Sequence, residues 1–207
     1  MKPSSGALAV LAVFLPSLSP ASPFSLSPAP VAAEMVVEPR SGTTFEAKRG
    51  SLTLIGIGLR TRTMLKVKVY AIGLYVADSM LPTLRAKVGS PDLYNELVWG
   101  DFPKELHLRL VRDVTAEQMR NNIREALDAQ GADKTRTEAL ISGFGPLRAG
   151  QDYRLRWLPG GALETISVGQ PNPPIPDKAF SAAGFSIWLG AHPIQSDIKK
   201  DLVSRLK

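Results

Sequence analysis

The feature that most constrains the fold is the segment at residues 65–77, whose pattern of apolar and polar residues changes halfway along. Between residues 65 and 70, apolar side chains at the odd positions alternate with two lysines and Tyr70, as in a strand with one apolar face. From residue 71 to residue 77 both faces are apolar, which is typical of a strand that is covered on both sides. Gly73 inside this run predicts a bulge or a close approach of another backbone. The fold therefore has to cover both faces of a sheet.

Three other stretches alternate between apolar and polar residues and are predicted to be strands. They are residues 51–58, 105–111 and 153–157. The last of them is followed by Pro-Gly-Gly and by a further strand-like run at residues 162–168, which indicates a β-hairpin. Residues 78–96 contain two prolines and a glycine and are expected to be irregular apart from one helical turn.

The clearest helix signal starts at Thr115. Thr115 and Gln118 have the spacing of a capping box, in which each side chain accepts a hydrogen bond from the other residue's backbone N–H. Apolar residues then fall on one helical stripe, namely Met119, Ile123, Ala126 and Leu127. Gly131 is suited to end this helix with a left-handed backbone. Further helices are expected at about residues 134–141, 178–189 and 195–206.

The predicted elements run strand, strand, strand, helices, hairpin, helices. This order is typical of an α+β domain in which an antiparallel sheet carries helices on one face. A length of 207 residues fits one domain, and 44% hydrophobic residues are enough to build a core. We expect this domain to occupy residues 51–207, after a polar lead-in at residues 34–50.

Residues 1–33 have the pattern of a cleaved secretory signal. They carry a single charge, Lys2, and an apolar run at residues 7–15 that is too short to span a bilayer. Val31-Ala32-Ala33 then supplies a cleavage site, which would make Glu34 the first mature residue, and cleavage after Ala21 is the alternative. We expect export to the periplasm or the medium, with no stable membrane span in the mature chain. A plastid transit peptide is the competing interpretation, but such peptides generally use arginine, which this segment lacks.

Composition excludes several classes of protein. The absence of cysteine excludes a disulfide framework and a thiol nucleophile. Neither of the two histidines, His107 and His192, has a neighbour at metal-binding spacing, so we predict no metal and no cofactor. The net charge of +6 suits an anionic ligand, an anionic surface or nucleic acid. Nucleic-acid binding is disfavoured, because the basic residues are dispersed and aromatic residues make up only 7% of the chain.

Most basic residues occur as alternating pairs on the predicted strands and are interpreted as solvated faces. Examples are Arg109 with Arg112, and Arg154 with Arg156.

Arg60 and Tyr70 suggest a different role. Arg60 follows the first predicted strand, and Tyr70 opens the stretch that is apolar on both faces. A guanidinium and a phenol that meet at the mouth of an apolar pocket would bind a carboxylate or a phenolate. The structural alternatives are that Tyr70 caps the core and that Arg60 pairs with a surface acid.

Two segments carry a resemblance to a known family. Residues 56–60 (Gly-Ile-Gly-Leu-Arg) and 65–76 (Leu-Lys-Val-Lys-Val-Tyr-Ala-Ile-Gly-Leu-Tyr-Val) resemble the chalcone isomerase family, and look most like its bacterial and fatty-acid-binding branches. The resemblance continues at residues 110–115 and 187–190, so that it spans about residues 51–206. It implies an open-faced β-sandwich, in which a long antiparallel sheet and a helical layer enclose an apolar cleft.

The resemblance also implies site residues. In plant chalcone isomerases an arginine helps to bind and activate the substrate, and Thr, Tyr and Asn side chains assist it. Arg60 matches the arginine, Tyr70 stands where those enzymes have the Thr, and the helix after Thr115 has no Tyr. In the fatty-acid-binding branch an arginine and a tyrosine hold a carboxylate, which Arg60 and Tyr70 would reproduce. The expected ligand-binding residues are Arg60, Tyr70, Ile72, Met119, Asn122 and Ile123.

These features support three hypotheses about function. The first is an exported binding protein that takes a fatty acid or a similar apolar anionic small molecule in a cleft between sheet and helices. The second is an isomerase, an intramolecular lyase acting on an enone-like phenol, with Arg60 and Tyr70 as catalytic residues. The third is a structural or interaction role without a ligand. The sequence leaves the oligomeric state open.

Overall fold

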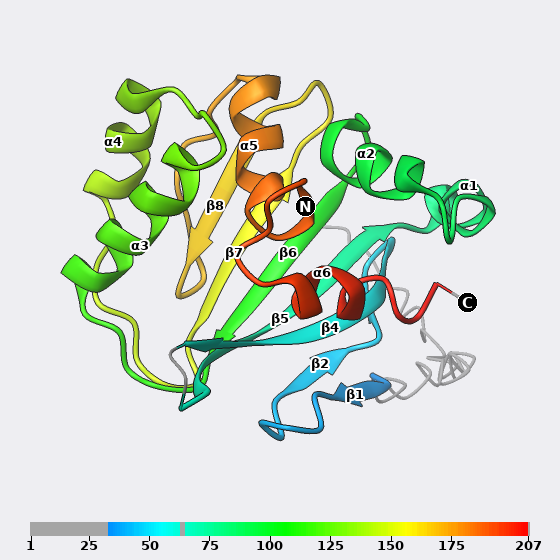
Figure 1. Cartoon of the computed structure of the whole chain (residues 1–207), viewed down its shortest axis with the longest axis horizontal. Coiled ribbons are helices and arrows are strands. Elements are labelled where there is room, and N and C mark those ends of the chain that lie inside the picture. Colours follow the sequence, from blue (N-terminus) through cyan, green and yellow to red (C-terminus); the bar gives the residue numbers. More distant parts are fainter. Residues whose placement is uncertain (1–32, 63–64, 207) are drawn as a thin grey trace, which may run out of the picture. The chain divides into compact units, whose positions relative to one another are not determined.

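The computed structural model describes residues 33–62 and 65–206, and a seven-stranded antiparallel sheet forms the centre of this part of the chain (Figure 1). In spatial order its strands are β3 (Lys48–Arg49), β4 (Leu52–Arg62), β5 (Val67–Ala77), β6 (Lys104–Leu110), β7 (Asp152–Trp157), β8 (Leu163–Ser167) and β9 (Gln170–Pro171). Each strand pairs with its neighbours in sequence. A separate pair of strands, β1 (Met35–Val37) and β2 (Thr44–Glu46), precedes the sheet.

The helices pack against one face of the large sheet. They are a 3-10 turn η1 (Asp78–Met80), α1 (Leu81–Ala86), α2 (Pro91–Trp99), α3 (Ala116–Asp128), α4 (Lys134–Ser142), α5 (Lys178–Leu189) and α6 (Ser196–Asp201). Apolar side chains from α1 to α6 join strand residues such as Ile72, Leu106 and Leu155 in one core. The expected α+β fold, an antiparallel sheet covered by a helical layer, is confirmed. No helix within residues 33–62 and 65–206 has the length and hydropathy needed to cross a bilayer.

Strand β5 is covered on both faces, as its sequence predicts. Ile72 and Leu74 belong to the core under the helices, whereas Ala71 and Tyr75 belong to a second apolar cluster on the opposite face. Phe45 of β2 completes this second cluster. The β1–β2 pair therefore provides the second covering layer, which the sequence had suggested only as a polar lead-in.

Three of the expected elements differ from the structure. The last helix, expected at about residues 195–206, ends at Asp201. The first strand does not end at residue 58 but continues to Arg62, so that Arg60 lies within β4. Residues 78–96 are not irregular, because they form η1, α1 and most of α2. Pro91 occupies the first turn of α2, where a missing N–H costs nothing, and Ser90 caps it. Pro82 lies in the first turn of α1 and Pro91 in that of α2, and Gly89 lies between the two helices.

The bulges also lie elsewhere than expected. The register at Gly73 is regular, and its lack of a side chain instead makes room for others, since a Cβ there would lie 2.9 Å from Leu54 and 3.1 Å from Phe45. The β4–β5 register shifts between Leu54 and Gly56, and again between Arg60 and Thr61. The second shift shapes the site described below.

The predicted signal at residues 1–33 lies outside the described residues except for Ala33.

Candidate functional site

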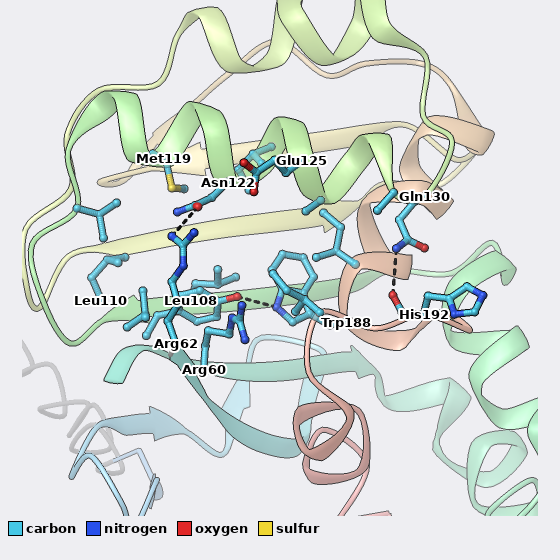
Figure 2. A pocket seen from close by; sticks show the side chains of 18 residues that line it. Arg60, Arg62, Leu108, Leu110, Met119, Asn122, Glu125, Gln130, Trp188 and His192 are labelled. Carbon is cyan, nitrogen blue, oxygen red and sulfur yellow. Dashed lines mark hydrogen bonds between the residues drawn. The ribbon is translucent and has the colours of Figure 1, made fainter. Parts of the chain in front are cut away.

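A cavity of about 290 Å³ lies between the sheet and the helical layer (Figure 2). Its walls come from β4, β5 and β6 on one side and from α3, α5 and the segment after α5 on the other. Most of this lining is apolar and includes Leu108, Leu110, Met119, Ile123, Ile187 and Ile194. Small-molecule sites typically have this form, an apolar hollow with a few well-placed polar groups.

The sheet register places two polar side chains next to each other in the cavity wall. Arg60 pairs directly with Tyr70, and Tyr70 pairs with Leu110. Residues directly opposite one another on neighbouring strands project from the same face, so that all three line the cavity. The meeting of Arg60 and Tyr70 therefore follows from strand pairing alone.

A bulge widens this wall. Thr61 pairs with Lys68 rather than with Val69, so that Val69 is an extra residue in β5. As a result Val69 and Tyr70, although consecutive, both line the cavity. The strict alternation read from the sequence placed Val69 on the face opposite Tyr70, and this was wrong.

Within residues 33–62 and 65–206, no carboxylate forms an ion pair with Arg60. Its Nη1 donates to the carbonyl oxygen of Thr61 at 2.9 Å and to Oε1 of Gln195 at 3.2 Å. Both acceptors are neutral. The cavity wall thus contains a cation that an anionic ligand would neutralise.

Tyr70 is positioned to donate a hydrogen bond. The indole Nε1 of Trp188 donates to its hydroxyl oxygen at 2.9 Å, so this oxygen already serves as an acceptor. Burial raises the pKa of Tyr70 to about 12, and the bond from Trp188 and the charge of Arg60 oppose this rise only in part. Tyr70 is therefore neutral at physiological pH, and its hydroxyl proton is available to a ligand.

Helix α3 contributes two polar side chains to the cavity lining, Asn122 and Glu125. The predicted capping box of Thr115 and Gln118 is present and fixes where the helix begins. One helical turn in, Met119, Asn122 and Ile123 face the sheet, and all three line the cavity. Figure 2 shows the side chain of Asn122 directed at that of Arg62 on β4, whose Nη1 donates to Asn122 Oδ1 at 2.9 Å.

A second polar contact lies just beyond the C-terminal end of α3. Gln130 Nε2 donates to the carbonyl oxygen of His192 at 3.2 Å (Figure 2). Both residues line the cavity. The bond from Arg62 to Asn122 therefore joins α3 to β4 across the cavity, and the bond from Gln130 joins the residues after α3 to the segment after α5.

Five of the six residues that the sequence singled out line the cavity, and Ile72 does not. Ile72 lies on the same face of β5 as Tyr70 but further along the strand, where it is fully buried in the core. The cavity is also lined by Trp188, Arg62 and Ile194, which were not among the residues expected from the sequence. Trp188 was noted only within the segment at residues 187–190, and nothing in its local sequence indicates that its indole reaches Tyr70.

On the opposite face of the sheet, several arginines form ion pairs with carboxylates that balance their charge. Arg109 forms a two-pronged contact with Asp152, at 2.7 and 3.0 Å. Arg156 contacts the buried Glu105 at 2.6 Å, and Arg49 contacts the same carboxylate at 2.9 Å. The interpretation of such arginines as solvated faces was thus wrong for Arg109 and Arg156, which form ion pairs with partly or fully buried acids. No cluster of three metal-ligating side chains occurs among residues 33–62 and 65–206.

The fold and the cavity together define the class of protein, a small α+β protein with an apolar cavity that is edged by a cation and a phenol. A family model described as chalcone isomerase-like matches residues 34–204. The chain therefore belongs to the chalcone isomerase-like family. The match begins before β1, so that it includes the β1–β2 pair.

A solved structure of similar fold is that of the Arabidopsis thaliana fatty-acid binding protein AtFAP1. The two chains superpose with a TM-score of 0.73 at 21% sequence identity, and the similarity covers 84% of this chain and 97% of that one. At this identity the similarity establishes the shared fold. No curated protein matches the sequence.

Proposed function

We propose that this protein binds a fatty acid or a similar apolar anionic small molecule in the cavity between sheet and α3. The single observation that carries this proposal is the unbalanced guanidinium of Arg60 beside the donor hydroxyl of Tyr70, at the edge of an apolar hollow. The two groups offer a carboxylate one charge-assisted and one neutral hydrogen bond. The description of AtFAP1 as a fatty-acid binding protein supports the same ligand class.

The cavity lining indicates what the acyl chain and the carboxylate of such a ligand would each contribute to binding. Burial of the acyl chain against residues such as Leu108, Met119 and Ile187 supplies affinity, at about 25 cal/mol per Å² of apolar surface. The contact with Arg60 fixes which end of the ligand faces the guanidinium. A ligand without a charge would bind through its chain alone.

Replacement of Arg60 tests this proposal. We expect Arg60→Ala to weaken the binding of decanoate by about 10- to 100-fold, since hydrogen bonds to charged groups contribute about 1.5–3 kcal/mol. Isothermal titration calorimetry would measure the dissociation constants. Arg112→Ala, which removes an exposed arginine that is not part of the cavity lining, is the matched control. Wild-type affinity in Arg60→Ala, or no binding to the wild-type protein, would overturn the proposal.

A second candidate function is isomerisation of an enone-like phenolic substrate. The observation that favours it is that Arg60 and Tyr70 are two donors side by side, an arrangement that stabilises an enolate oxygen as negative charge develops on it. The addition of a phenol to an enone within one molecule needs no other reactant. An absorbance assay with a chalcone tests this function, and turnover that Arg60→Ala abolishes would support it.

We also propose that residues 1–33 direct export. The support is their composition, with one charge, an apolar run and small residues before Ala33. Mass spectrometry of the protein recovered from its native source would test this. A mature chain that begins at or near Glu34, or after Ala21, is the expected result, and an intact N-terminus would contradict it.

A further inference from the structure

The side chain of Gln195 contacts β4 through three hydrogen bonds. Its Oε1 accepts from the backbone N–H of Thr61 at 3.1 Å and from Nη1 of Arg60 at 3.2 Å. Its Nε2 donates to the carbonyl oxygen of Leu59 at 3.4 Å. Gln195 comes just before α6 and is 135 positions away from Arg60 in the sequence. It is therefore a tertiary contact to the residue that carries the proposed function.

The contact exists because the outer edge of β4 is open at this point. Strand β3 pairs only with Leu52 and Thr53, and no other strand of the described residues pairs with this edge of β4. The amide group of Gln195 is both a donor and an acceptor. It bonds the free carbonyl of Leu59 and the free N–H of Thr61, as a neighbouring strand would.

This pairing fixes the orientation of the amide. The NH₂ group has to face the carbonyl of Leu59, because a carbonyl oxygen cannot donate. The amide oxygen consequently faces Thr61 and Arg60. Arg60 thus receives an acceptor that carries no charge.

We propose that Gln195 is a positioning residue that holds the guanidinium of Arg60 at the cavity without neutralising it, and that this neutral contact makes the cavity select anionic ligands. The inference rests on the proposed function and adds to it the residue that sets charge selectivity. The arginines on the other face of the sheet provide the contrast. Asp152 and Glu105 hold Arg109 and Arg156 just as firmly, but they also balance their charge.

The variant Gln195→Glu tests whether Gln195 must be uncharged or only has to hold the guanidinium of Arg60 in place. It has nearly the same shape and keeps an acceptor for Thr61 and Arg60, but it loses the bond to the Leu59 carbonyl and places a carboxylate against Arg60. The charge of Arg60 is then balanced without an anionic ligand. We expect the dissociation constant of decanoate to rise by about tenfold or more, and that of decan-1-ol to stay unchanged. Calorimetric titration of both probes measures the two effects, and only the loss of charge selectivity distinguishes this role from a purely structural one.

Two further variants complete the experiment. Gln118→Glu makes the same change of charge on α3, preserves the capping box and lies outside the cavity lining, so both probes should bind as in the wild type. Gln195→Ala removes the contact without adding charge. It should weaken decanoate binding less than Gln195→Glu and leave decan-1-ol binding unchanged. Thermal denaturation shows whether Gln195→Glu is folded. If it is not, Gln195→Ala serves as the test variant.

The outcomes are distinct. Decanoate affinity at the wild-type level in both Gln195 variants, or an equal loss for decanoate and decan-1-ol, would overturn the role of Gln195 while Arg60→Ala still reports on the proposed function. If the wild-type protein does not bind decanoate, or if Arg60→Ala binds it equally well, the proposed function itself fails, and this inference fails with it.

Discussion

Tyr70 is the residue whose chemistry depends most on its surroundings. Its hydroxyl accepts from Trp188, and burial raises its pKa to about 12, so that it donates to a ligand and does not ionise. A phenolate in this position would repel a carboxylate. The affinity for an anionic ligand therefore depends on this raised pKa whenever the pH approaches the ordinary value of a tyrosine.

We expect the affinity for decanoate to be the same at pH 7 and pH 10. The ligand carboxylate is ionised at both values, since carboxyl groups titrate near pH 4, and Tyr70 stays protonated at both. Tyr70→Phe should weaken binding by about 2- to 10-fold at either pH, the effect of one neutral hydrogen bond. Calorimetry at the two pH values checks this. A loss of affinity at pH 10 that is absent in Tyr70→Phe would show that Tyr70 ionises in this range.

The polar residues of the site could be predicted from the sequence more fully than its apolar ones. Arg60 and Tyr70 stand out because a charge and a phenol are unusual beside an apolar strand. Ile72 resembles a lining residue equally well, but whether it borders the cavity or the core depends on the side chains packed over it. Gln195 and Trp188 could not be found, because their roles arise only when α5 and α6 are folded against the sheet.

At the scale of elements, β4 and α6 approach each other closely. A Cβ atom on Gly56 would lie 2.2 Å from the backbone carbonyl carbon of Leu202, just beyond the end of α6. Only glycine allows this approach. The contact keeps α6 on β4 and thereby keeps Gln195 in reach of Arg60.

Gly56→Ala is accordingly expected to lower the free energy of unfolding by at least about 1–3 kcal/mol, the usual effect of forcing an extra methyl group into a packed site. The clash is with backbone, which cannot rotate away. Gly143→Ala is the matched control, because nothing lies within 4 Å of its added Cβ and its φ is −84°. Urea denaturation of the three proteins measures the difference. Equal stability of Gly56→Ala and the wild type would contradict the packing described here.

The helices α3, α4 and α5 were predicted more accurately than the strand ends, whereas α1 and most of α2 fell in a segment expected to be irregular and α6 ends at Asp201. The capping box at Thr115 and the aspartate at position 177, which caps α5, are local signals that act within one turn. The continuation of β4 to Arg62 depends instead on its pairing with β5, and the bulge at Val69 depends on the register between the two strands. Such features are set by partners distant in sequence, so an alternation pattern alone does not show them.

At the level of the whole molecule, Lys104 links stability to pH. Its side chain is 1% exposed, and its Nζ donates to the carbonyl of Gly100 at 2.7 Å. Three aromatic rings surround the amine, with Trp157 the nearest at 4.0 Å. Burial nevertheless lowers the pKa of Lys104 to about 7, while Glu96 and Asp101 oppose this shift.

The sign of the effect follows from proton binding. Between pH 7 and about 10.5 the unfolded chain holds a proton on Lys104 that the folded protein lacks, so the free energy of unfolding rises with pH in this window. Lys104→Met removes this dependence and should be the more stable protein at pH 7, with the difference shrinking towards pH 10. Urea denaturation at several pH values checks this. Parallel pH profiles of the two proteins would contradict it.

The overall architecture could be predicted because it rests on averages over many residues. The change of pattern along β5 requires a layer on both sides of the sheet, and the order of elements requires helices on one of them. What supplies the other layer could not be predicted, because the polar segment at residues 34–50 has too few apolar side chains to indicate strands. Its large apolar side chains are Met35, Val36 and Val37 of β1 and Phe45 of β2, and Phe45 is buried in one cluster with Tyr75.

The bond between Trp188 and Tyr70 has one practical consequence. The indole borders the cavity, and its N–H is tied to the hydroxyl that a ligand would contact. An occupant changes the polarity around the ring, and with it the wavelength and intensity of its fluorescence. The protein therefore contains an intrinsic optical reporter, which could detect an occupant without any added label.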